Sequence, residues 1–174
     1  MSTLNLTSVP EYGITPNVKR LRARVRVITA KIKKSKKGDK MVEVGLEFFS
    51  PEKVIDIDRK ERVIAGLKTR MYVMLGGKGV AGTAQLHQKL GLPLEINKET
   101  EEEFDEAMQA LYADSGLAFE AFFSTEEGQS TEYDPETGEQ KPMLDDEGNP
   151  VRGGFQWGMI SANDIVKKVE DPGF

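Results

Sequence analysis

The stretch VKRLRARVRVITAKIKKSKKGDK, residues 18–40, decides how the first part of the chain folds. It holds eleven of the 24 Lys and Arg residues and a single acid, although the whole chain has a formal net charge of −5. Apolar residues alternate with arginines over residues 21–27, which is the period of a strand with one buried face. After Val27 the alternation slips by one residue, so that Ile28 becomes an inward position. This slip predicts a β-bulge and a strongly coiled strand.

Two further strands are predicted after this one. A turn at residues 33–40 is followed by apolar residues that alternate again over residues 42–48. The first two strands are therefore expected to form a long, bent, basic hairpin. A third strand is predicted in residues 66–75. On one face of that strand lie Lys68, Arg70, Tyr72 and Met74.

Two helices are predicted after the third strand. The first, in residues 82–93, ends at Gly91, which takes the left-handed conformation that stops a helix. The second, in residues 98–116, begins with Thr100 and Glu103 in the spacing of a capping box. Its apolar residues recur on one stripe, as in a helix that packs on a core.

The last third of the chain combines strand signals with a long polar segment. Strand patterns recur in residues 117–123 and 153–160. Between them, residues 124–150 are expected to form a polar loop, because they contain two strong turn signals. Residues 161–171 fit either a capped helix or a closing strand.

These elements favour a mainly β chain with helical insertions (α+β). A coiled first strand, a helical insertion after the third strand and a long segment before the last strand are typical of an OB-like small five-stranded barrel. At this length a single domain over residues 1–174 is expected, with its core at about 19–160.

Composition excludes several classes of protein. The chain has no cysteine, which excludes disulfides and thiolate metal sites, and its single histidine, His87, excludes a multi-histidine metal site. His87 is expected at the surface of the first helix. We expect no enzyme activity, no cofactor and no bound metal. No signal peptide and no apolar run of about 18 residues is evident, so a cytoplasmic protein without a membrane partner is expected.

The arginines of the first strand face outward and continue into a row of lysines. Such a row matches the spacing of phosphates along a nucleic acid, and nearby aromatic rings would stack on its bases. The alternative is a solvated strand face whose charges pair with Glu43 and Glu47 across the hairpin. The candidate nucleic-acid-binding residues are Arg20, Arg22, Arg24, Arg26, Lys31, Lys33, Lys34, Phe49, Lys68, Arg70, Tyr72, Phe155 and Trp157.

Two other motifs admit a functional interpretation. Residues 76–83, GGKGVAGT, resemble a phosphate-binding loop but lack its residue order, and a flexible connection is the expected structure. Asp56, Asp58 and Glu61 form a carboxylate trio that would hold Mg²⁺ in a nuclease, or they are simply exposed residues.

The segment EDPGF, residues 170–174, is similar to the acidic, aromatic-ended tips of single-stranded DNA-binding proteins. In pattern over residues 19–160, the chain resembles the small OB-fold single-stranded DNA-binding proteins of bacteriophages. That resemblance implies a protein of the host cytoplasm that sheathes and protects single strands during replication or recombination, without sequence preference. It also implies that Asp171 and Phe174 dock on replication or recombination partners.

Two rival functions remain open at this point. Residues 95–149 carry eighteen acids and two lysines, so a phage structural or assembly protein would pair this region with the basic hairpin of another copy. A homo-oligomer is the state expected of such a protein. The third candidate is a Mg²⁺-dependent nuclease built on the carboxylate trio.

Overall fold

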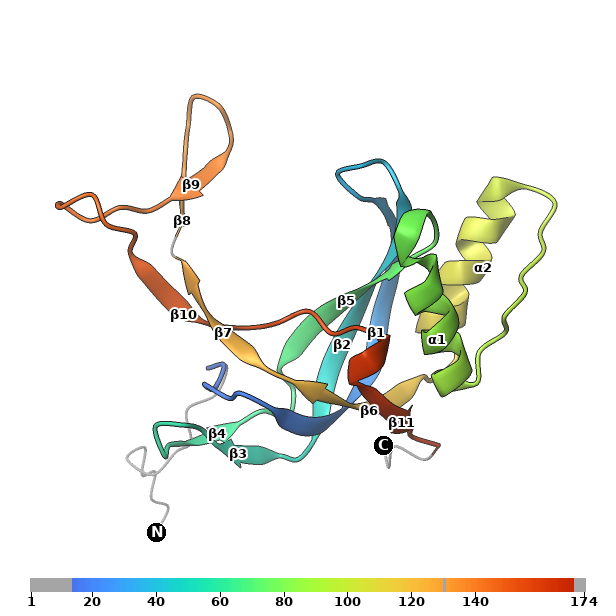
Figure 1. Cartoon of the computed structure of the whole chain (residues 1–174), viewed down its shortest axis with the longest axis horizontal. Helices are drawn as coiled ribbons and strands as arrows, with labels where there is room; N and C mark the ends of the chain where they lie inside the picture. The colour runs from blue at the N-terminus through green and yellow to red at the C-terminus, as the bar shows by residue number, and fades with distance from the viewer. Residues whose placement is uncertain (1–13, 130, 171–174) are drawn as a thin grey trace, which may run out of the picture.

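The computed structural model describes residues 14–129 and 131–170 and is built around one five-stranded antiparallel sheet (Figure 1). In the order in which they lie side by side, its strands are β11 (Ile165–Lys168), β6 (Ala118–Phe123), β1 (Leu21–Lys34), β2 (Lys40–Ser50) and β5 (Lys68–Met74). The remaining elements are β3 (Lys53–Ile55), β4 (Glu61–Val63), η1 (Gly77–Gly79), α1 (Val80–Leu90), α2 (Glu101–Ala113), β7 (Thr125–Gln129), β8 (Thr131–Tyr133), β9 (Gln140–Pro142), β10 (Arg152–Trp157) and η2 (Ala162–Asp164).

The long hairpin of β1 and β2 has the predicted bulge. The pairing register shifts between Val27 and Thr29, where the apolar alternation slips in the sequence. Because one extra residue is inserted there, Val27 pairs with Leu46 while Ala30 pairs with Val44, and apolar side chains stay on one face along the strand. The bulge predicted from the sequence is thus confirmed.

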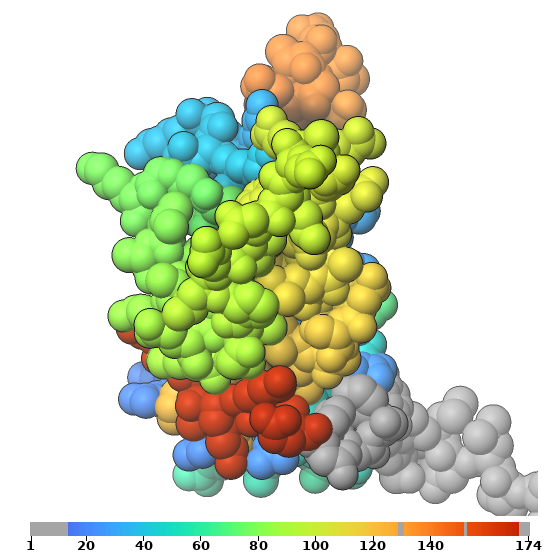
Figure 2. Space-filling view, turned by 90° about the vertical axis from the view of Figure 1, so that its right-hand side faces the viewer, coloured from blue at the N-terminus to red at the C-terminus, as the bar shows by residue number. Residues whose placement is uncertain are grey.

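The hydrophobic core lies on one face of the sheet, which we call the inner face. Its sheet residues include Val25, Val42, Val44, Leu46, Phe48, Met71, Val73 and Phe119. Leu86 and Leu90 of α1 and Met108 and Tyr112 of α2 pack against them. In Figure 2, α1, the segment at 91–100 and α2 cover this side of the molecule as one layer.

Two of the predicted helix ends are confirmed, the N-cap of α2 at Thr100 and the end of α1 at Gly91, whereas α2 ends at Ala113, before the predicted Gly116. The side chain of Thr100 accepts a hydrogen bond from the backbone N–H of Glu103 at 3.1 Å, which satisfies a free donor of the first turn of α2. Gly91 ends α1 with φ of 67°, a left-handed conformation that glycine adopts without a Cβ penalty.

The far end of β1 contacts α2 instead of β6. Beyond Arg26, β1 is no longer paired with β6, and Gln109 of α2 accepts a hydrogen bond from the N–H of Ile32 at 3.1 Å.

The sheet does not close into the expected barrel. Among the described residues β5 and β11 are its two edges and do not pair with each other. Instead α1 bridges them. Thr83 donates to the carbonyl of Met74 at the end of β5, and Lys89 donates to the carbonyls of Ala162 and Ile165 at 2.6 Å and 2.9 Å. The predicted fold class, mainly β with helices (α+β), is confirmed. The predicted closed barrel is not found, because α1 lies between the edge strands β5 and β11, which would pair with each other in a closed barrel.

The segment expected as a polar loop, residues 124–150, contains strands. β7 pairs with β10 and β8 pairs with β9, and these two antiparallel pairs form an arm that extends away from the sheet in Figure 1. At the far hairpin, Lys141 pairs with Asp134 at 2.5 Å. Within residues 161–170, a capped helical turn, η2, leads directly into the strand β11, which pairs with β6.

The expectation that His87 lies at the surface is wrong. The residue is 5% exposed, and its Nδ1 lies 2.7 Å from the carbonyl of Pro93. A carbonyl only accepts, so Nδ1 carries the proton and Nε2 accepts from the Tyr112 hydroxyl at 2.6 Å. Burial raises the pKa of this hydroxyl, so it keeps its proton. Polar neighbours along α1 suggested exposure, but α2 and the segment after α1 cover the ring.

Candidate nucleic-acid interface

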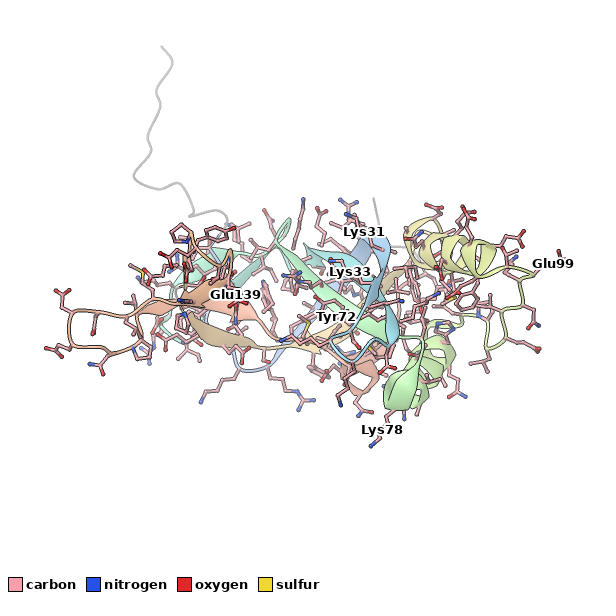
Figure 3. The ribbon with its side chains drawn as sticks, turned by 90° about the horizontal axis from the view of Figure 1, so that it is seen from above. Lys31, Lys33, Tyr72, Lys78, Glu99 and Glu139 are labelled. Atoms are coloured by element: carbon pink, nitrogen blue, oxygen red, sulfur yellow. The ribbon has the colours of Figure 1, made fainter. Side chains whose placement is uncertain are left out.

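The outer face of the sheet, opposite the core, carries a dense group of cations. Strand register places seven of them there: Arg22, Arg24, Arg26, Lys31, Lys33, Lys68 and Arg70. Three carboxylates share this face, namely Glu43, Glu47 and Glu120. In Figure 3, Lys31, Lys33 and Tyr72 lie on the part of the sheet between the helices and the arm. The label of Glu139 marks the position of the arm.

Glu120 of β6 holds two arginines of β1. Its carboxylate lies 2.8 Å from Nη2 of Arg22 and 3.5 Å from Nε of Arg24. The hydrogen bond from Arg22 holds the pKa of Glu120 below its ordinary value. Sequence analysis missed Glu120, because its position beside β1 depends on a strand pair 98 residues apart.

The two glutamates of β2 hold cations from both neighbouring strands. Arg26 donates to Glu47, with its Nε at 2.9 Å. Glu43 accepts from Lys33 at 2.7 Å and lies 3.7 Å from Arg70 of β5. The hydrogen bond from Lys33 lowers the pKa of Glu43. The alternative interpretation, a solvated strand face, predicted ion pairs with Glu43 and Glu47, and both are present. Glu120 adds a third carboxylate that this interpretation did not include.

The cations nevertheless form the outermost layer of this face. The three glutamate side chains are 11–19% exposed, whereas the side chains of Arg22, Lys33 and Arg70 are 53%, 46% and 57% exposed. Seven cations thus lie above three carboxylates. In the described part of the chain, Lys31 and Lys68 make no ion pair with any acid. The surface that an approaching polyanion meets is therefore positive.

We expect acid to weaken the fold through these glutamates. Because the folded-state pKa of Glu43 and of Glu120 lies below the ordinary value near 4.5, their stabilisation is present above that pH and is lost as the pH falls through the folded pKa. Changing both to Gln should lower Tm at pH 7 by about 2–4 °C and flatten the decline of Tm below about pH 5. Thermal melting from pH 7 to pH 3 measures both effects.

The matched control changes Glu132 and Glu136 to Gln, since both are exposed acids on the arm. This variant should keep the wild-type Tm at pH 7 and the wild-type acid slope. Equal behaviour of the two double variants would show that the ion pairs of the outer face contribute no stability.

The aromatic candidates are distributed over the molecule. Tyr72 is half-buried on the outer face, directly opposite Glu43. Phe49 is half-buried beside the register shift at the end of β2. Arg20 places its guanidinium 4.0 Å from the ring centre of Phe122, an outer-face residue of β6 that sequence analysis missed. The alternation within residues 117–123 was the signal that could have revealed it.

Four candidates from distant parts of the sequence meet at one cavity. Lys68 and Arg70 at the start of β5 lie beside Phe155 and Trp157 at the end of β10, around a cavity of about 340 Å³. Thr15, Thr69, Glu126, Gln156 and Met159 complete its lining. The cavity lies where the arm joins the sheet, at the end of the cationic face.

Other candidates lie apart from this cavity. Lys34 is exposed near the tip of the β1–β2 hairpin, together with Lys36 and Lys37. Asp171 and Phe174 lie outside the described residues.

The remaining motifs do not form sites in the described part of the chain. Asp56 is buried, and its carboxylate accepts from the backbone N–H of Lys60 at 3.0 Å and lies 3.5 Å from Arg62, so it closes the turn between β3 and β4. No group of three or more His, Asp or Glu residues there is arranged to hold a metal ion. The segment at 76–83 forms η1 and the first turn of α1.

No protein-family model matches the chain, and no curated protein matches its sequence. Over residues 14–129 and 131–170, no helix combines the length and the apolar character needed to cross a membrane.

Proposed function

We propose that the protein binds single-stranded nucleic acid, most directly single-stranded DNA, without sequence preference and without chemistry of its own. The observation that carries this proposal is the layering of the outer face, where exposed cations lie above partly buried glutamates. Glutamates at this depth orient the arginines without masking them. Exposed cation heads are what phosphate contacts require, and such contacts account for most non-specific affinity.

The strand order supports an OB-like interpretation of the sheet. In an OB fold the fourth strand pairs with the first, and a helix connects the third strand to the fourth. Here β6 pairs with β1, and α1 and α2 lie between β5 and β6. By this correspondence β2 and β5 are the second and third strands, whose outer face binds oligonucleotides in OB folds. Lys68, Arg70 and Tyr72 lie on that face.

The proposal extends to the biological setting that the resemblance implies. The protein would cover single strands in the cytoplasm during phage-type replication or recombination. Its terminal tip, with Asp171 and Phe174, would recruit partner proteins.

Salt dependence tests the proposal directly. Each phosphate contact to a single strand contributes about −0.7 to the slope of log K against log salt. With about four to six contacts from the outer face, the slope for a fluorescent oligothymidine should lie between about −3 and −4. Fluorescence anisotropy at several salt concentrations measures it. A slope shallower than about −1, or no binding at low salt, would rule out the cationic face as a nucleic-acid site.

Self-association is the second candidate, and charge favours it. The arm carries acids such as Glu132, Glu136 and Glu139, all exposed, while the outer face of the sheet is cationic. A protein that assembles by pairing these surfaces would form oligomers at low salt in the absence of DNA. Sedimentation velocity at low and high salt, run beside the anisotropy titration, separates the two functions.

A further inference from the structure

We propose that the cavity between β5 and the base of the arm takes one unstacked nucleobase of the bound strand, with its phosphate on Lys68 and Arg70. This inference rests on the proposed function and deepens it. The cationic face would attract any polyanion, whereas this cavity would give single strands their advantage over duplexes.

Trp157 provides a rigid wall for such a base. Its ring centre lies 4.4 Å from that of Phe48 with the planes 34° apart, and 6.1 Å from that of Phe123 at 81°. Phe48 and Phe123 belong to the buried core, so they fix the indole from behind while Trp157 still lines the cavity. A ring held in this way loses little conformational entropy when a base stacks on it.

Phe155 is a second ring at the cavity, and it lies outside the hydrophobic core that the described residues form. It lines the same cavity and is half-buried, but it is absent from the residues that form the hydrophobic core or pack on it. Trp157, two residues later on β10, points the same way, because side chains alternate along a strand. In the described part of the chain, Trp157 packs on the core and Phe155 does not. Two neighbouring rings on one face of a strand are the arrangement expected of a surface on which bases stack.

The charges around the cavity favour a base inside and a phosphate at one side. Arg70 is 57% exposed, and its ion pair with Glu43 is long, at 3.7 Å, so its guanidinium remains open to a phosphate. Glu126 also lines the cavity and repels phosphate from the arm side. The phosphate is therefore directed to β5. Gln156 and Thr69 supply neutral polar groups for base edges.

The size and shape of the site select for single strands. A cavity of about 340 Å³ lies at the small end of the range for ligand sites, about 300–1,000 Å³. A base in a duplex is stacked and paired, and it must be flipped out before it can enter such a cavity. A base in a single strand has no pairing to lose. The cationic face attracts any nucleic acid, and the cavity adds affinity for single strands alone, because their bases can enter without losing a pairing partner.

The experiment uses Trp157 as an internal reporter, because it is the only tryptophan in the chain. Its emission is followed during titration with unlabelled oligothymidine and with a duplex of the same length, and affinities are measured in parallel by anisotropy. In the wild type, oligothymidine should quench the emission and the duplex should not. Phe155→Ala should weaken single-strand binding by about 5- to 150-fold and change duplex binding by less than about twofold.

Two further variants keep the test decisive. Tyr133→Ala removes the aromatic ring of a residue that is 67% exposed on the arm and does not line the cavity, so the variant should bind like the wild type. Trp157→Phe removes no hydrogen bond within the described part of the chain, because the indole N–H has no acceptor there, and it should lose single-strand affinity while keeping its fold. Thermal melting of each variant checks the fold.

The outcomes separate this inference from the proposed function. If oligothymidine binds the wild type with a steep salt slope but leaves Trp157 emission unchanged, the cavity proposal is overturned and nucleic-acid binding stands. The same conclusion follows if Phe155→Ala keeps the wild-type ratio of single-strand to duplex affinity. If the wild type binds neither nucleic acid at low salt, both proposals fail together.

Discussion

Replacing Arg22, Arg24 and Arg26 together by Ala is expected to lower single-strand affinity about 100-fold at low salt. Each charge-assisted hydrogen bond contributes about 1.5–3 kcal/mol before screening, and a tenfold change in affinity corresponds to about 1.4 kcal/mol. The loss also has a second cause. Without these arginines Glu120 and Glu47 lose the partners that cover them and repel phosphate. Anisotropy with oligothymidine measures the affinity, and the salt slope should become shallower by about 2.

Two control variants identify the cause of that loss. Changing the same three arginines to Lys keeps the charge and should recover most of the affinity, because phosphate attraction needs a cation rather than a guanidinium. Changing Lys53, Lys60 and Lys98 to Ala removes the same number of charges from exposed positions outside the five-stranded sheet, and should cost less than about threefold. If the two triple-Ala variants, one of arginines and one of lysines, bind oligothymidine with the same affinity, the outer face is only a solvated surface.

Tyr112→Ala is expected to be the most destabilising single substitution proposed for this protein. The side chain is fully buried between α2 and the inner face, and truncating a buried aromatic ring costs about 3–5 kcal/mol. For a chain of this size, that loss should lower Tm by about 10 °C or more. The change also leaves Nε2 of His87 without its donor in a buried site. Thermal melting followed by circular dichroism measures the effect.

Tyr112→Phe separates the hydroxyl from the ring. It keeps the packing and removes only the hydrogen bond to His87, so it should cost about 1–3 kcal/mol, less than the Ala variant. Well below their melting temperatures, both variants should bind oligothymidine like the wild type, because Tyr112 packs on the face opposite the cations. If the fully folded Tyr112→Phe variant bound oligothymidine more weakly, packing on the inner face would affect binding at the outer face. That result would contradict the assignment of stability to the inner face and binding to the outer face.

The local features of this fold were predictable from the sequence. The period-two alternation assigned the faces of β1, β2 and β5, and the slip after Val27 located the bulge. The cap at Thr100 and the stop at Gly91 were equally visible. Each of these signals depends on interactions between residues a few positions apart or on the backbone preference of one residue.

The sequence could not reveal how distant elements meet. His87 was expected at the surface because its neighbours on α1 are polar, yet its burial depends on where α2 packs. The barrel was expected to close, but whether β5 reaches β11 depends on what fills the gap, and α1 does so through Thr83 and Lys89.

By itself, the sequence determined that one strand face would be cationic, because alternation forces the arginines of β1 onto one side whatever the rest of the chain does. Only the tertiary structure decided how much of that charge remains open. Glu120 lies 98 residues from Arg22 and reaches it through the pairing of β6 with β1. In the same way, the cavity at Trp157 exists because the arm returns to the start of β5. Charge along one strand is a local property, whereas ion pairing and cavity shape require segments whose closeness is set by sheet order and helix packing.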